Sequence, residues 1–108
     1  MTEIEVLNNK FDDYCNNEFE LYNMCVDYIK DRLGSLPKNE IYLDQNVLPI
    51  VIRHYSNGVV TFRSVNRVYL IDGNIYADLK CVDSYEITCT EVVDLYKIAK
   101  AISSIIEK

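Results

Sequence analysis

The 108-residue sequence has few of the residues that build most catalytic and cofactor sites. It contains one histidine, three glycines, two prolines and no tryptophan. Gly34, Gly58 and Gly73 are isolated from one another, so neither a P-loop nor a Rossmann glycine motif can be formed. His54 has no orienting partner at a recognisable spacing, and we interpret it as an ordinary strand residue. We therefore expect a protein that is not an enzyme.

The cysteines also lack the spacing of a functional motif. They occur singly, without the C-x-x-C pair of zinc sites or thioredoxin-like redox sites. Because one histidine offers little help as a further ligand, we expect no metal site and no cofactor. Free cysteine is among the most buried residue types, so we predict reduced core residues. These are Cys15, Cys25, Cys81 and Cys89.

Long apolar runs and excess positive charge are missing as well. No run approaches the ~20 apolar residues of a membrane-spanning helix, and the N-terminus has acids where a secretory signal is basic. We expect a cytoplasmic protein without membrane contact. The 11 basic and 17 acidic residues give a net charge of −6, which argues against direct nucleic-acid binding. The acidic surplus lies in residues 1–36, with 8 acidic and 3 basic groups.

Residues 3–33 show the apolar period of a helix. Thr2 and Glu5 have the spacing of a capping box, and Gly34 followed by Pro37 predicts the end. The weak helix formers before Glu18 leave two alternatives open. The helix breaks or bends at 16–18, or it continues for roughly 45 Å, overhangs its own domain and invites a partner chain.

The middle of the chain changes to the period of two that is typical of strands, with short turn signals between them. We predict an α+β fold in one domain, 1–108: a long N-terminal helix, an antiparallel meander of about five strands, and a C-terminal helix at 91–107 packed on one sheet face. Thr88 or Thr90 would cap that last helix. The predicted strand segments are 40–44, 48–55, 59–65, 67–71, 75–80 and 85–88.

The stretch LIDGNIYADL, residues 70–79, offers oxygen ligands around a glycine, as a calcium loop does. The glycine and glutamate that an EF-hand needs at its sixth and twelfth positions are absent. A two-residue turn at Asp72 and Gly73 instead places Leu70 opposite Ile75 and Arg67 opposite Asp78. Because each facing pair then matches in character, we predict a hairpin.

Arginine and tyrosine gather on one predicted face of the sheet. Strand alternation points Arg63, Arg67 and Tyr69 away from Phe62 and Val68. These residue types are enriched at protein interfaces, although a solvated face with cross-strand ion pairs is the simpler alternative. The arginines could also clamp an anionic small ligand. The predicted binding residues are Arg53, Arg63, Arg67, Tyr69 and Tyr76.

Acidic residues follow the polar side of the predicted N-terminal helix. This face could imitate nucleic-acid phosphates as an inhibitor does, or simply solvate the helix. The leading hypothesis is a small acidic, non-enzymatic interaction or regulatory module that binds a protein partner and self-associates through the long helix or a sheet edge. The nine tyrosines support it, because tyrosine suits partly covered surfaces. The acidic face consists of Glu5, Asp12, Asp13, Glu20, Asp27 and Asp31.

Overall fold

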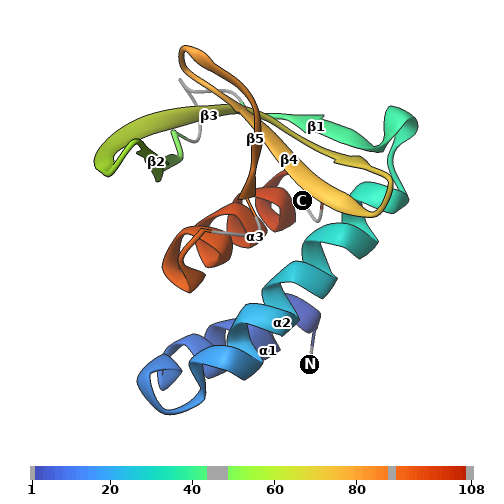
Figure 1. Cartoon of the computed structure of the whole chain (residues 1–108). Helices are drawn as coiled ribbons and strands as arrows, with labels where there is room; N and C mark the ends of the chain where they lie inside the picture. The colour runs from blue at the N-terminus through green and yellow to red at the C-terminus, as the bar shows by residue number, and fades with distance from the viewer. Residues whose placement is uncertain (1, 44–48, 88–89, 107–108) are drawn as a thin grey trace.

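A computed structural model describes residues 2–43, 49–87 and 90–106. It contains three α-helices and a five-stranded antiparallel sheet, so the predicted α+β class is confirmed (Figure 1). Predictions that fall on residues 44, 48, 88 and 107, including Thr88 as a cap, lie outside the described residues. The elements are α1 (Glu3–Phe11), α2 (Tyr14–Gly34), a 3-10 turn (Pro37–Asn39), β1 (Glu40–Tyr42), β2 (Val51–Ser56), β3 (Val59–Ile71), β4 (Asn74–Leu79), β5 (Val82–Glu86) and α3 (Val92–Ile106).

The N-terminal segment is helical as predicted, but it forms a hairpin of two helices. Thr2 and Glu5 form the predicted capping box of α1. The chain leaves the helix at 12–13, a few residues before the weak point expected at 16–18, and Asn17 is also non-helical (φ −143°, ψ 38°). The return of α2 along α1 keeps the molecule within 37 × 33 × 30 Å. No helix therefore overhangs the domain in the described structure, and that argument for self-association no longer applies.

Ion pairs at both ends join the two helices of this hairpin. Lys10 Nζ lies 3.1 Å from Glu20 Oε1 near the connection. At the open end, Arg32 Nη2 lies 3.5 Å from Glu3 Oε1. The two contacts can form together only because α1 and α2 run antiparallel.

The long strand β3 organises the sheet. Its N-terminal half pairs with β2, while its C-terminal half lies between β1 and β4. The hairpin predicted at residues 70–79 is confirmed, with Leu70 opposite Ile75 and Arg67 opposite Asp78. Asp72 (φ 50°) and Gly73 (φ 80°) both have the left-handed conformation that a type I′ turn requires.

The two strands predicted at 59–65 and 67–71 are one strand with a β-bulge. Val65 pairs with Leu79, but Arg67 pairs with the adjacent Asp78, so Asn66 is an extra residue in β3. A bulge of one residue reverses the alternation of side chains. Consequently Val65 and Val68, three residues apart, both point into the core and are fully buried.

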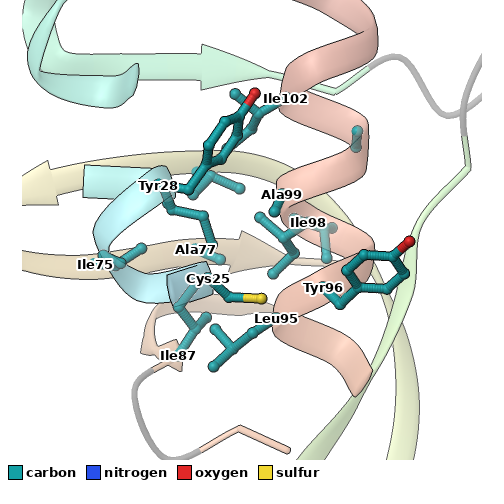
Figure 2. Close-up of a cluster of buried hydrophobic side chains, with 14 of the residues drawn as sticks. Cys25, Tyr28, Ile75, Ala77, Ile87, Leu95, Tyr96, Ile98, Ala99 and Ile102 are labelled. Carbon is teal, nitrogen blue, oxygen red and sulfur yellow. The ribbon is translucent and has the colours of Figure 1, made fainter. Parts of the chain in front are cut away.

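The hydrophobic core lies between one face of the sheet and the helices. Figure 1 shows all three helices on the same side of the sheet, as predicted for the C-terminal one. Figure 2 shows Cys25 of α2, Leu95 and Ala99 of α3 and Ala77 of β4 meeting in this core. The opposite face of the sheet is left without a covering helix in the described structure.

Two of the predicted core cysteines can be placed. Cys25 is free and buried, as predicted. Cys81 is exposed, so its prediction is wrong: it lies in the turn between β4 and β5 with φ 67°, outside the packed face. The structure does not describe the side chain of Cys15 or any part of Cys89. Among the described helices, none has the length and apolar character needed to cross a bilayer.

Candidate interaction surfaces

Arg67 lies at the centre of a network on the uncovered sheet face. Its Nη1 is 2.8 Å from Glu40 Oε2 and its Nε is 3.0 Å from Asp78 Oδ2. The guanidinium also lies 3.9 Å from the centre of the Tyr69 ring. Three strands contribute to this network, in which two carboxylates surround one guanidinium and leave a net charge of −1.

Tyr69 and Tyr76 belong to the same network and stack at 5.9 Å between ring centres. The Tyr69 hydroxyl donates to Ser84 Oγ at 2.9 Å and lies 3.2 Å from Asp78 Oδ1. Only 5% of Tyr69 is exposed. The structure therefore brings Arg67, Tyr69 and Tyr76 together as predicted, but the polar groups of Arg67 and Tyr69 are occupied by neighbours within the chain.

Arg63 lies on the other face of the sheet, so the predicted orientation of this residue is wrong. It pairs with Ile52, which is fully buried on the core side. The bulge at Asn66 causes the reversal, because residues before and after it alternate in opposite phase. Arg63 Nη1 donates to the carbonyl of Lys80 at 3.1 Å. Phe62 takes the outward position instead.

Arg53 is also separate from the Arg67 network, at the outer edge of β2. Its backbone N–H donates to Asp94 Oδ2 at 3.0 Å, and its Nη1 lies 3.2 Å from Asp94 Oδ1. Glu91, just before α3, is 3.4 Å from the same nitrogen and accepts from the Tyr55 hydroxyl at 2.7 Å. These contacts fix the start of α3 against β2. The Arg53 guanidinium is thus already paired with carboxylates.

Exposed apolar side chains concentrate on the ribbon formed by β2 and residues 59–64 of β3, which we call the β2–β3 ribbon. Among the described residues, nine large apolar side chains are exposed, and five of them lie on this ribbon. Phe62 is 66% exposed and Val60 47%. Cross-strand pairing of Arg53 with Phe62 and Tyr55 with Val60 places them on one face. The five are Val51, Tyr55, Val59, Val60 and Phe62.

The edge of β3 within the ribbon has backbone groups that no described strand pairs with. The Val65 N–H donates to the Ile50 carbonyl, so alternate residues from Val65 back toward the turn bond to β2. Val60 and Phe62 consequently direct their N–H and C=O groups away from β2. Pairing with β4 begins only at Val65, and no other described strand lies beside residues 60–62.

Sequence reasoning missed this surface because it assigned Val60 and Phe62 to the core face. The signal was nevertheless present in VVTF, residues 59–62, which has apolar residues in both phases of a strand. At the edge of a sheet that is covered on one side, such a segment must expose apolar atoms. The sequence does not indicate which of the two alternating sets of side chains faces outward, because the bulge at Asn66 determines it.

The six predicted acidic residues do not share one helix face, because they are divided between α1, the connection and α2. Glu5 is used in the capping box, and Asp13 accepts from Asn16 Nδ2 at 2.6 Å. Glu20 and Asp31 are paired with Lys10 and Arg32. Asp12 follows the last residue of α1, and Asp27 is exposed on α2.

No group of three or more His, Cys, Asp or Glu side chains among the described residues is placed to hold a metal ion. His54 contacts the Tyr85 ring at 4.9 Å between centres and lies 3.5 Å from Thr61 Oγ1.

In comparisons with known proteins, no family model, no curated protein and no solved structure matches this chain.

Proposed function

We propose that this protein is an interaction module that forms homodimers through the β2–β3 ribbon. The observation that carries the proposal is the coincidence of two features in one short segment: exposed Val60 and Phe62 side chains, and unpaired backbone groups on the same residues. An exposed apolar strand edge is a template for pairing with another strand. Native proteins blunt such edges with charge, proline or a cover. Residues 59–62 contain no charged residue and no proline, and no described strand pairs with the outer edge of residues 60–62.

A second copy of the chain fits this edge by symmetry. If two β3 strands run antiparallel with Thr61 at the two-fold axis, Val60 of one copy lies opposite Phe62 of the other. The outward N–H and C=O groups of these residues then form four hydrogen bonds, each contributing roughly 1 kcal/mol. The same pairing brings the two apolar side chains into contact on one face. The opposite edge, on β2, is less suitable because Asp94 already occupies the Arg53 N–H.

Light scattering coupled to size-exclusion chromatography tests the proposal. We expect a mass near twice 12.6 kDa for the natural chain. Phe62→Glu removes the apolar contact and Val60→Pro removes one outward N–H without touching the pairing to β2, so both should give monomers. Ile71→Glu is the matched control, because Ile71 is half exposed on β3 but outside the ribbon.

Two results would refute the proposal. One is a monomeric natural chain at about 1 mM, a concentration at which even weak association is populated. The other is equal loss of dimer in Phe62→Glu and Ile71→Glu, which would place the interface elsewhere.

A further inference from the structure

The hairpin of α1 and α2 forms a groove that the β2–β3 ribbon does not share. Its volume is about 400 Å³, and seven side chains line it. Of these, Leu7 and Tyr28 are buried, while Val6 and Met24 are partly exposed. The remaining three lining residues are Glu3, Asp27 and Asp31.

The lining residues lie on one face of each helix. On α2 the lining positions are 24, 27, 28 and 31, and on α1 they are 3, 6 and 7. Residues at these intervals lie on one face of a helix. At 1.5 Å per residue, the α2 stripe is about 10 Å long, which corresponds to two turns of a docked helix. Grooves of this kind in other proteins bind the apolar face of an amphipathic helix.

The groove has a net negative charge, which favours a basic partner. Among the described residues, its lining has three carboxylates and no basic side chain. The Arg32 guanidinium lies 4.6 Å from the centre of the Tyr28 ring and pairs with Glu3 at 3.5 Å and with Asp31 at 2.6 Å, so three negative charges and one positive charge leave −2. Among the described residues, Asp27 has no ion-pair partner. An apolar base with an acidic rim is complementary to an apolar stripe flanked by lysine or arginine.

We propose that the groove between α1 and α2 binds a basic amphipathic helix of a partner protein. This inference goes beyond the homodimer and uses a different surface, so the two proposals can fail independently. Apolar side chains at intervals of three and four residues on the partner enter between Val6 and Met24. A basic side chain that flanks them on the partner reaches Asp27, whereas Glu3 and Asp31 are already paired with Arg32.

A designed helical peptide of about 18 residues, long enough to be helical, serves as the probe. It carries leucine at positions i, i+3 and i+7 with lysine beside them, and a second peptide replaces every lysine by glutamate. Fluorescence anisotropy should give saturable binding of the lysine peptide and at least ~10-fold weaker binding of the glutamate peptide. The Met24 methyl group provides an NMR reporter within the groove, assigned with Met24→Leu.

Asp27→Lys should weaken binding of the lysine peptide at least ~5-fold more than Asp83→Lys does. Asp83 is exposed on β5, so the two variants change the net charge equally at different places. Asp27→Asn, a milder change, should weaken binding in the same direction. Equal effects of Asp27→Lys and Asp83→Lys would reduce the interaction to general charge attraction and overturn the proposal. Absence of saturable binding, equal binding of both peptides, or an unshifted Met24 signal at saturation would also overturn it.

Discussion

The carboxylate of Asp94 binds both the backbone N–H and the guanidinium of Arg53, at 3.0 and 3.2 Å. A side chain near the start of α3 thereby occupies a donor on the outer edge of β2. Asp94 is 1% exposed, so its charge depends on nearby cations: Arg53 at 3.2 Å and, more distantly, Lys97 at 3.7 Å. The contact links α3 to the sheet and at the same time occupies one backbone donor on the β2 edge of the β2–β3 ribbon.

Asp94→Ala should lower the free energy of unfolding by about 3 kcal/mol, because it leaves the Arg53 N–H and guanidinium without their main acceptor. Asp94→Asn keeps an oxygen for the N–H and loses only the charge, so we expect a smaller loss of about 1–2 kcal/mol. Urea denaturation of both variants measures the difference. Equal losses would mean that the backbone hydrogen bond contributes little.

The bulge at Asn66 leads to a second prediction, which concerns the stability of variants at Val65 and Val60. Val65→Ala should cost about 2 kcal/mol, because Val65 is fully buried and the substitution leaves a cavity. Val60→Ala should change stability by less than about 0.5 kcal/mol in the monomer, since Val60 is half exposed. Without the bulge, uninterrupted alternation from Val68 would bury Val60 and not Val65. Denaturant titrations in the Phe62→Glu background, where chains are expected to be monomeric, separate the two cases.

Sequence reasoning predicted those features of the fold that neighbouring residues determine, and it missed those that depend on packing between distant parts of the chain. The register of the β3–β4 hairpin was predictable because Asp72 and Gly73 specify the turn and each facing pair confirms it. The bulge was not, because a single extra residue is fixed by packing on both sides of β3 and has no local sequence signal here. That one residue decided whether Arg63 or Phe62 faces outward, and with it the composition of the candidate surface.

The helical hairpin illustrates the same limit. Periodicity correctly predicted helix for residues 3–33, and the weak helix formers near Asn17 indicated a break nearby. The choice between a long helix and a hairpin depends on tertiary contacts, such as the stacking of Phe11 on Tyr96 of α3 at 4.0 Å. Local propensity contains no information about these contacts.

The glycines supply a matched pair of substitutions. Gly73 has φ 80°, where a Cβ is strained, so Gly73→Ala should destabilise the chain by about 1 kcal/mol. Gly34 ends α2 without a positive φ, and a Cβ there meets no atom within 4 Å. Gly34→Ala should therefore stabilise by up to about 1 kcal/mol, because alanine restricts the unfolded chain and favours the helix. Thermal unfolding should shift in opposite directions for the two variants, and a shared direction would contradict this account.

The buried thiol of Cys25 should make the free energy of unfolding depend on pH in the alkaline range. Burial raises the pKa of its thiol from the usual 9.0 to about 12. As the pH rises, the thiol ionises first in the unfolded chain, which favours unfolding. The contribution of the protonated thiol to the stability of the folded state is therefore complete below pH 9 and is lost between pH 9 and 12. The expected slope from this group is about −1.4 kcal/mol per pH unit in that window.

Cys25→Ala isolates this effect, because alanine does not titrate while Tyr55 and Tyr96, whose pKa values are also raised, remain in place. Urea titrations at intervals from pH 8 to 11 should show a steeper fall for the natural chain than for Cys25→Ala. Parallel curves would mean that the thiol reaches water in the folded state, which would contradict its place between α2 and α3. Alkylation followed by peptide mapping provides the second measurement: at pH 8 the exposed Cys81 should react, whereas Cys25 should react only after unfolding.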